Sequence, residues 1–357
     1  MNPSRLAFFF AASALAIAGC GPDSTDEASA AKDTAAAAPH EVLVFGGVDA
    51  IVQWLQAERW WGEVTEEQIG NVPHVVITGI APGWQTAAQD MPVPQKKEIF
   101  YRFMLPLALR ANELVRERRG RLEQMVKDLD AGQALSDEQL EGLRIAARFL
   151  RIRDEETAAQ LGGDAVELRA VIDTALYRLD EIPAGLVLGQ AAYESGYGTS
   201  RFAVLGNALF GQWTYSGEGL VPQQQRKHLG DHRIASYDWP FDSVRSYFLN
   251  LSSHPAYEDL RALRAKLKRE GKPVTSLALV DGLRRYSERG QAYVDTLKGI
   301  IRKNGLDRAD NAAFRDEPMR FVVTADGEDA ATGLRKEIEH MRAAGELGEI
   351  IARMRLE

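Results

Sequence analysis

Cysteine is almost absent from this chain of 357 residues, which contains a single one, Cys20. An intrachain disulfide is therefore excluded, because it would need two thiols in the same chain. Basic residues are also in the minority, since 43 lysines and arginines stand against 51 aspartates and glutamates and give a formal net charge of −8. Proteins that bind polyanions are normally basic, so we expect no nucleic-acid partner.

Two common catalytic signatures are missing as well. The chain has neither a glycine-rich loop that would cradle phosphates nor a Gly-x-Ser-x-Gly turn that would expose a nucleophilic serine. His228 and His232 are four residues apart, a spacing that suits two zinc ligands on a helix. However, Gly230 and Asp231 lie between them in an expected loop, and no third ligand is evident. We therefore predict no metal and no cofactor.

The composition is that of an ordinary globular protein, with 45% hydrophobic and 26% charged residues and ample material for a core. Short apolar runs predict strands at 42–45, 75–77 and 321–323, and the alternating segment 213–237 predicts an irregular β-hairpin. Apolar residues at three- and four-residue steps predict helices, with Pro106 expected to kink the first. The expected helices are 96–129, 136–150, 164–179, 240–253, 257–270, 275–284, 289–303 and one from about Leu334.

The first twenty residues have the pattern of a bacterial export signal. Arg5 supplies a positive start, and residues 6–18 form an apolar run that is too short to span a membrane permanently. The run ends in Leu-Ala-Ile-Ala-Gly-Cys at 15–20, which resembles a lipobox, in which the peptide before the cysteine is removed and the cysteine takes lipid. We expect lipidation at Cys20; the alternative is a plain secretory signal with an incidental cysteine.

This expectation sets the predicted location. Residues 1–20 are expected to be a lipoprotein signal peptide, and residues 21–41, rich in Ala, Ser, Thr and Asp, to be a flexible tether. A membrane contact would then be made through lipid on Cys20. Gly21, rather than an aspartate, follows the cysteine, which favours the periplasmic face of the outer membrane.

The most informative stretch reads as a buried helix that begins near Pro183. The residues after this proline are small or apolar on nearly all sides, and Gly196 and Gly198 end the helix. Glu194 is the charged residue near its end. Burial and the negative end of the helix dipole both disfavour a charged carboxylate, so the pKa of Glu194 is expected to be raised, as a general acid requires. The alternative is a structural glutamate held by an arginine.

A family resemblance rests on this stretch. Residues 191–203 read Ala-Ala-Tyr-Glu-Ser-Gly-Tyr-Gly-Thr-Ser-Arg-Phe-Ala, and 206–211 read Gly-Asn-Ala-Leu-Phe-Gly. They resemble the Ala-x-x-Glu-Ser-Gly-Trp-Gly-x-Ser-x-Phe-Ala and Gly-Asn-Asn-Leu-Phe-Gly motifs of the bacterial glucosaminidase family (glycoside hydrolase family 73), Bax-like branch. Tyr197 replaces the usual tryptophan, and Ala208 replaces the second asparagine. Segments 250–257 and 286–294 also match that branch, so the resemblance covers about residues 90–305.

Together with the helical pattern, the resemblance implies a mainly α, lysozyme-like α+β fold with a small β-hairpin beside the active-site cleft. It implies that Glu194 is the catalytic acid and that glycan strands of peptidoglycan are the partner. Aromatic side chains offer flat faces on which sugars stack. The expected substrate-binding residues are Tyr197, Ser200, Asn207, Phe210 and Trp213.

A second catalytic group is harder to assign. Cleavage of a glycosidic bond also needs stabilisation of a cationic sugar carbon, commonly by a carboxylate across the cleft. Glu218 at the hairpin turn is our candidate, with Asp231 and Asp238 behind it, although a turn residue can equally be exposed without a role. The 2-acetamido group of the substrate is a further alternative. Tyr286 corresponds to a tyrosine near the family's catalytic centre, or else lies at the edge of the core.

The sequence divides into a catalytic domain, residues 95–305, and two flanking segments. We expect 42–94 to be an irregular segment packed on that domain and 306–357 to be an appendage. The tryptophans at 54, 60 and 61 form either a sugar platform or, more commonly, a packing cluster.

Three functions compete. The first is a lipid-anchored peptidoglycan hydrolase, an endo-β-N-acetylglucosaminidase. The second is a lytic transglycosylase, whose usual Gly-Leu-Met-Gln type segment is replaced here by Gly-Asn-Ala-Leu-Phe-Gly at 206–211. The third is a wall-binding lipoprotein without activity, against which the presence of Glu194 argues. The first is preferred.

Overall fold

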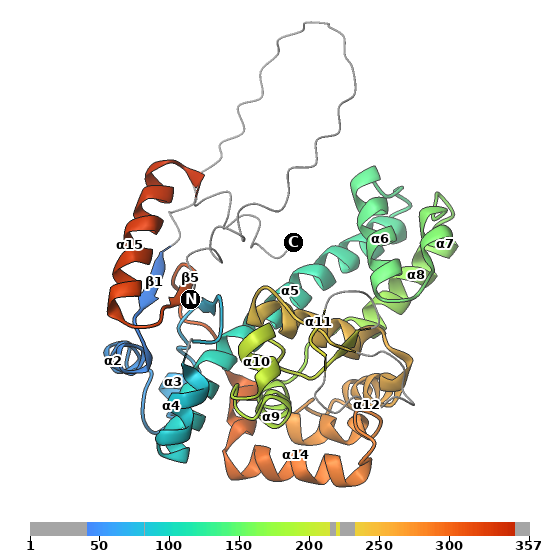
Figure 1. Cartoon of the computed structure of the whole chain (residues 1–357). Helices are drawn as coiled ribbons and strands as arrows, with labels where there is room; N and C mark the ends of the chain where they lie inside the picture. Colours follow the sequence, from blue (N-terminus) through green and yellow to red (C-terminus); the bar gives the residue numbers. More distant parts are fainter. Residues whose placement is uncertain (1–40, 82, 215–218, 222–232, 347–357) are drawn as a thin grey trace, which may run out of the picture.

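The computed structural model describes residues 41–81, 83–214, 219–221 and 233–346. Most of them are helical, and the strands form one three-stranded and one two-stranded sheet (Figure 1). The predicted mainly α, lysozyme-like α+β class is confirmed. In this part of the chain, no helix combines the length and the apolar character that crossing a membrane requires.

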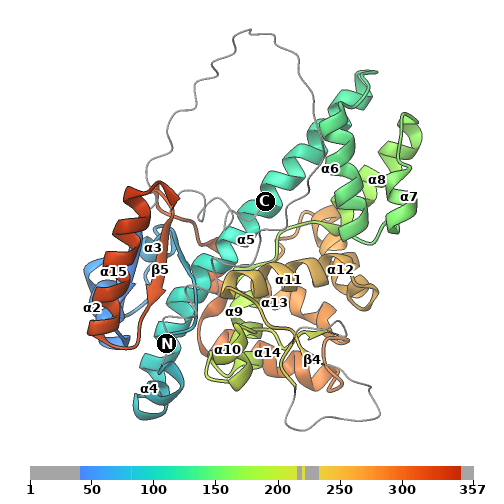
Figure 2. The ribbon, with the colours of Figure 1, turned by 45° about the horizontal axis from the view of Figure 1, so that its top comes forward.

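Helix α5 (Val93–Asp130) is the central element, and it runs through the whole molecule (Figure 2). Pro106 lies inside the helix without ending it. At its far end three helices form an arm, the first of which begins with the predicted capping box of Ser136 and Gln139. The arm consists of α6 (Asp137–Phe149), α7 (Glu155–Ala159) and α8 (Ala165–Arg178).

Helix α9 (Ala184–Ser195) carries the central motif and is buried on nearly every side. Gly185 permits a close approach to the 3-10 helix η4 (Leu306–Asn311), because a Cβ at this position would lie 2.3 Å from the backbone oxygen of Leu306. Helices α5 and α14 (Gln291–Lys303) pack on other sides of α9. Further elements of this region are α10 (Arg201–Gly206), α11 (Pro240–Ser253), η2 (Pro255–Tyr257), α12 (Glu258–Arg269), α13 (Ser276–Leu279) and η3 (Val280–Leu283).

The predicted hairpin is present at its two described ends. Strands β3 (Trp213–Thr214) and β4 (Arg233–Ile234) pair antiparallel, with Trp213 opposite Ile234. Ile234 also forms a bridge to Leu220. The backbone from Ala235 bonds to Gln212, so the hairpin stem continues directly from the end of the motif.

A small parallel sheet joins the two ends of the described chain. Its strand order is β1 (Val42–Phe45), β5 (Arg320–Thr324), β2 (Val75–Ile77), so the C-terminal strand lies between the two N-terminal ones. Phe321 is the register partner of both Val42 and Val76. Helices α2 (Val48–Ala57) and α15 (Glu328–Ala343) pack against β1, and α5 and α11 pack against β2. The short helices α3 (Glu66–Ile69) and α4 (Trp84–Asp90) lie in the same N-terminal part of the chain.

Residues 42–94 are therefore not the irregular segment that the sequence predicted, since they contain two strands and three complete helices before α5. The three strands were predicted, but their shared sheet was not. Because the middle strand comes from the other end of the chain, no local pattern reveals the pairing. The closing helix begins at Glu328, ahead of the predicted Leu334.

The N-terminal tryptophans pack against α5. The Trp54 ring stacks on Phe103 with centroids 6.2 Å apart. Trp60 is 2% exposed, and its indole N–H donates to the backbone oxygen of Arg102 at 3.4 Å. Of the two interpretations of this aromatic cluster, packing fits these contacts and a sugar platform does not.

Candidate active site

The chain turns sharply directly after Glu194. Ser195 ends α9, donates its hydroxyl to the backbone oxygen of Ala191 at 2.6 Å and accepts the backbone N–H of Gly198 at 2.8 Å. Gly196, Tyr197 and Gly198 have φ angles of 59°, 61° and 75°. Glycine adopts this left-handed conformation readily, but a residue with a side chain is strained there by about 1–2 kcal/mol. The motif glycines thus permit the turn, and Tyr197 is held in it by its surroundings.

The residues that hold Tyr197 in place come from α4 and α5. The indole N–H of Trp84, the first residue of α4, donates to the backbone oxygen of Tyr197 at 3.1 Å. The Tyr197 ring meets Phe100 and Tyr101 of α5 edge-on, with centroids 5.7 and 5.9 Å away. The turn after Glu194 is therefore clamped between α4 and α5.

Glu194 itself is half-buried and lies among neutral groups. The hydroxyl of Tyr293 donates to its Oε1 at 2.8 Å. Burial raises the pKa of Glu194, and the Tyr293 hydrogen bond opposes part of that rise. No arginine or lysine of the described chain contributes to this balance. The alternative of an arginine-held structural glutamate does not fit these described neighbours, whereas a carboxyl group whose neutral form is favoured by burial does.

A chain of hydrogen bonds leads from Glu194 into the core. Tyr293 accepts the side-chain N–H of Gln190 at 3.0 Å, and Gln190 accepts the hydroxyl of Tyr247 at 2.5 Å. Gln190 and Tyr247 are fully buried. Their positions are fixed by packing, so they hold the Tyr293 hydroxyl with its proton directed at Glu194. This leaves the other carboxyl oxygen, Oε2, beside Gly211, whose missing side chain opens space there.

None of these three network residues is among the site residues predicted from the sequence. Gln190 had a usable signal, since it precedes Glu194 by four residues and therefore lies on the same helix face. Tyr293 falls within the matching segment 286–294, but only its spatial approach from α14 reveals its contact with Glu194.

Tyr286 does lie in this cluster. Its ring stacks on that of Tyr293 with centroids 5.6 Å apart and planes 4° from parallel, and its hydroxyl donates to the backbone oxygen of Phe210 at 3.1 Å. Tyr286 thus contacts Tyr293, the residue whose hydroxyl donates to Glu194, but does not itself bond to Glu194. Burial, together with nearby Tyr293 and Glu194, raises the pKa of Tyr286 well above its usual value, so it is neutral.

Three of the side chains predicted to bind substrate also form contacts within the protein. The Ser200 hydroxyl accepts the backbone N–H of Ala203 and caps α10. The Asn207 side chain accepts from Ile80 and donates to the backbone oxygens of residues 237 and 238. Phe210 is 2% exposed and stacks on Tyr247 with centroids 4.1 Å apart. Substrate contact by these three side chains remains a prediction. Tyr197 is partly exposed, so part of its surface is open to a ligand.

Other predicted residues lie outside what the structure describes. Glu218, Asp231, His228, His232 and Cys20 are not among the described residues, and of Trp213 only the backbone is. Asp238 is exposed, and its carboxylate lies near that of Asp242, whose pKa is raised by burial and in part by Asp238. The described residues contain no group of three histidine, cysteine or acidic side chains that would hold a metal ion.

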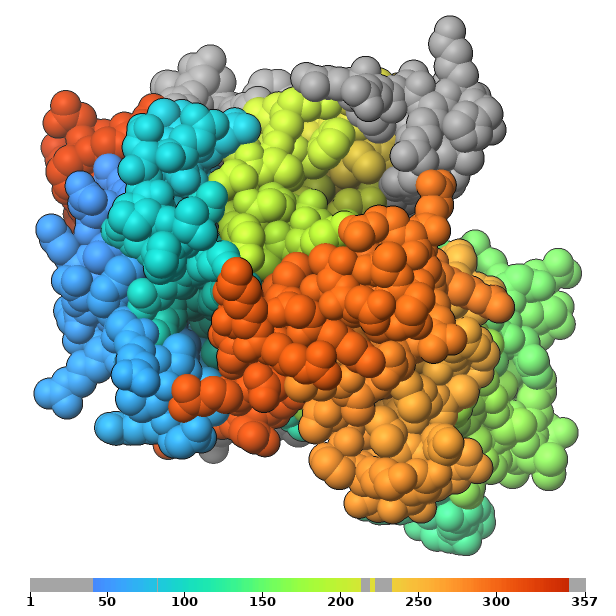
Figure 3. All heavy atoms as spheres, turned by 90° about the horizontal axis from the view of Figure 1, so that it is seen from below, coloured from blue at the N-terminus to red at the C-terminus, as the bar shows by residue number. Residues whose placement is uncertain are grey.

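The face that carries the motif is hollowed. In Figure 3 the yellow-green residues around the motif lie recessed between the cyan segment of α4 and early α5 and the orange segment around α14. A separate apolar cavity of about 60 Å³ lies behind the motif, between the small sheet and α5, with Trp84, Phe100 and Gly198 in its wall. Glu194 does not line that cavity, so the surface hollow, open to solvent, is the candidate cleft.

Comparisons with known proteins place this site in a family. Residues 174–306 match the profile of the Glucosaminidase family, described as mannosyl-glycoprotein endo-beta-N-acetylglucosaminidase. Protein bax of Escherichia coli (strain K12) is 36% identical over 132 residues, which are 37% of this chain and 46% of that protein. The chain thus matches about half the length of this relative. No solved structure matches the chain significantly.

The matched residues include α9 with Glu194, the turn that follows it, and α14 with Tyr293. Residues 174–306 thus match the glucosaminidase family, and the identity to Protein bax supports its Bax-like branch for this segment.

Proposed function

We propose that this protein is a peptidoglycan hydrolase, an endo-β-N-acetylglucosaminidase that cleaves glycan strands with Glu194 as the general acid. The observation that carries the proposal is the environment of Glu194, a half-buried carboxyl group with a raised pKa among neutral tyrosines at a hollowed face. The family of the matched segment and the aromatic surroundings support a sugar substrate.

In the proposed reaction, Glu194 gives its proton to the glycosidic oxygen as the bond between that oxygen and the sugar C1 breaks. Positive charge develops on C1, and a water oxygen adds there while its proton is removed by a base. The Tyr293 hydroxyl holds Oε1, so the proton to be donated resides on Oε2, beside Gly211. After proton loss, the same hydroxyl stabilises the carboxylate.

For the second catalytic role we propose Glu218, which follows β3 of the hairpin. The 2-acetamido group of an N-acetylglucosamine unit is the alternative nucleophile, in which case Glu218 is dispensable. Replacing Glu218 by glutamine distinguishes the two: a loss of turnover comparable to that of Glu194→Gln supports a carboxylate partner, and unchanged turnover supports the substrate's own group.

Mass analysis of the products from purified sacculi tests the function. A reducing N-acetylglucosamine end is expected. An anhydro-muramic end would instead make the protein a lytic transglycosylase, and no cleavage, together with binding to sacculi, would leave a wall-binding protein without activity. The Glu194→Gln variant serves as the control for contaminating hydrolases.

We also propose that a lipid on Cys20 holds the protein at the periplasmic face of the outer membrane. The support is the sequence alone, namely the lipobox-like residues 15–20 and the polar segment 21–41. Cys20→Ser is expected to release the protein into the soluble periplasmic fraction. Retention of this variant in the membrane fraction would contradict the anchor.

A further inference from the structure

Two cationic side chains are held against tyrosines that lie on either side of Glu194 in the motif sequence. The guanidinium of Arg289 donates to the hydroxyl of Tyr193, the residue before Glu194, and lies 6.0 Å from the centre of its ring. The ammonium of Lys97 lies 5.4 Å from the centre of the Tyr197 ring. Lys97 comes from α5 and Arg289 from the segment before α14, so separate parts of the chain supply the same arrangement.

Neither cation has a carboxylate partner among the described residues. The remaining contact of Arg289 is to the Thr296 hydroxyl at 3.3 Å, and that of Lys97 is to the Asn304 side-chain oxygen at 3.0 Å. Many other arginines of this acidic protein are paired, for example Arg320 with both Glu58 and Glu317. Neutral partners orient Arg289 and Lys97 while leaving their positive charge available for a ligand.

The two cations lie near opposite ends of α14. Arg289 lies just before the first residue of α14, and Lys97 contacts Asn304, just after its last. A helix of 13 residues is about 20 Å long. Tyr293, which holds Glu194, is in the first turn of the same helix. A glycan strand that lies along α14 would thus pass Glu194 and reach both charges.

We propose that Arg289 and Lys97 form a cationic rim that binds carboxylates carried by the glycan strand. The inference rests on the proposed function. Two groups of peptidoglycan supply this chemistry: the free lactyl carboxylate of a muramic acid without its peptide, and the carboxylates of an attached stem peptide. Arg289 is the stronger element, because a planar guanidinium can take a carboxylate through two parallel hydrogen bonds, whereas Lys97 acts as a point charge.

The test measures glycan binding by the full-length Glu194→Gln variant, so that turnover does not enter. Three soluble glycans are compared: bare strands, strands with stem peptides, and bare strands whose carboxylates have been converted to neutral amides. Adding Arg289→Gln is expected to weaken binding of a carboxylated glycan roughly tenfold and Lys97→Gln about threefold, with little effect on the amidated one. Both losses should shrink as salt concentration rises.

Arg148→Gln is the matched control, since Arg148 is an exposed arginine on the distant helix α6 and its replacement removes the same charge. A loss seen on bare strands assigns the lactyl carboxylate, and a loss confined to peptide-bearing strands assigns the stem peptide. Equal losses on charged and amidated glycan, no loss, or the same loss from Arg148→Gln would overturn the proposal. If wild-type protein cleaves no sacculi, the proposed hydrolase fails, yet the binding comparison still decides the rim.

Discussion

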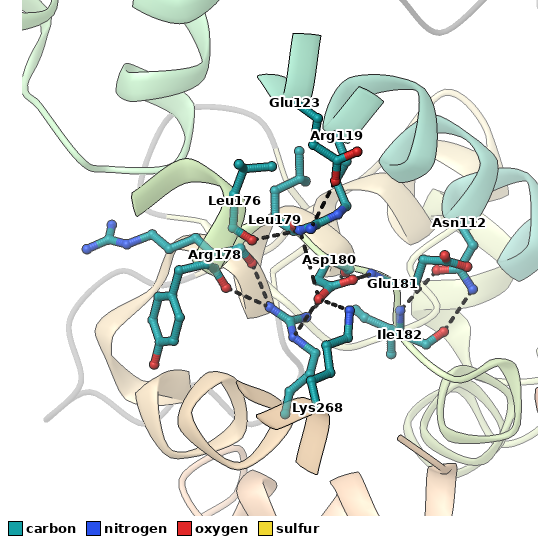
Figure 4. A network of polar contacts seen from close by, with 12 residues as sticks. Asn112, Arg119, Glu123, Leu176, Arg178, Leu179, Asp180, Glu181, Ile182 and Lys268 are labelled. Atoms are coloured by element: carbon teal, nitrogen blue, oxygen red, sulfur yellow. Dashed lines mark hydrogen bonds and ion pairs between the residues drawn. The ribbon is translucent and has the colours of Figure 1, made fainter. Parts of the chain in front are cut away.

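Asp180, which lies shortly before α9, and Glu194, near its C-terminal end, are both shielded from water but have opposite neighbours. Three cations surround the Asp180 carboxylate: Lys268 in direct contact, Arg264 at 3.7 Å and Arg119 at 3.9 Å (Figure 4). Burial alone would raise the pKa of Asp180, but these charges outweigh it and lower the pKa below its usual range. Among the residues that the structure describes, the only side chain that bonds to the Glu194 carboxyl group is Tyr293, and the pKa of Glu194 is raised.

The cations around Asp180 also connect backbone segments. Arg119 of α5 donates to the backbone oxygens of Leu176 and Leu179, and Arg264 of α12 donates to those of three residues, 177, 178 and 180. These oxygens belong to the end of α8 and the linker into α9, and they would otherwise be unpaired. A shielded carboxyl group thus stabilises the fold where cations favour its charged form, and it is suited to proton donation where neutral hydroxyls let it keep its proton.

The largest effect should come from Glu194→Gln. Glutamine keeps the shape of the side chain but has no proton to donate, so turnover of sacculi is expected to fall roughly 1,000-fold. Product release from sacculi measures turnover, and circular dichroism checks that the fold is retained. Hydrolysis at near wild-type rate would show that Glu194 is not the acid.

Asp180→Asn should have the opposite effect, a loss of stability without a loss of turnover. The substitution leaves the buried Arg264 without its counter-charge, so the free energy of unfolding is expected to fall by about 3 kcal/mol. Turnover of the folded variant should remain near that of wild type. Urea unfolding supplies the measurement, with Asp173→Asn, at an exposed pair with Arg169, as the control that should change stability little. A comparable loss in the control would contradict the comparison.

The two carboxyl groups should also respond to pH with opposite signs. Because the folded pKa of Asp180 is lowered, its stabilisation is complete above the unfolded value, near 3.8, and is lost as pH falls through the folded pKa. The stability difference between wild type and Asp180→Asn should therefore narrow on acidification. For Glu194 the folded pKa is raised, so wild type should lose stability relative to Glu194→Gln as pH rises above about 4.5, its unfolded value.

Denaturant unfolding of the three proteins from pH 3 to pH 8 measures both trends. Parallel stability curves for wild type and Glu194→Gln would mean that the pKa of Glu194 is the same in the folded and the unfolded state. The hydrolase proposal would then lose its main physical support.

The smallest effect is expected from Tyr293→Phe. The hydrogen bond from Tyr293 lowers the pKa of Glu194, so its removal should raise that pKa further. A general acid must be protonated, and the loss of activity at high pH should therefore move to higher pH, by less than about one unit. The pH profile of kcat/KM measures this shift, and a shift to lower pH would contradict the assigned hydrogen bond.

Much of the site's framework could be predicted from the sequence because it is local. The apolar run after Pro183, the single acid at 194 and the glycines at 196 and 198 are near neighbours in the chain, and together they indicate a buried helix that ends in a sharp turn. Tyr293 could not be assigned in the same way, because its contact with Glu194 joins residues 99 positions apart. The small sheet could not be predicted from local patterns either, because its strands pair residues as distant in the chain as Val76 and Phe321.

The placement of β5 has a practical consequence for dissecting the protein. The matched family segment, 174–306, is encoded as an insertion between β2 and β5, so the three-stranded sheet exists only when both chain ends are present. Trimming the chain after η4 would delete the middle strand and leave β1 and β2 as two separate edges. Trp84, which pins the turn after Glu194, follows β2 directly, so a minimal catalytic fragment would lose part of what shapes its own active site.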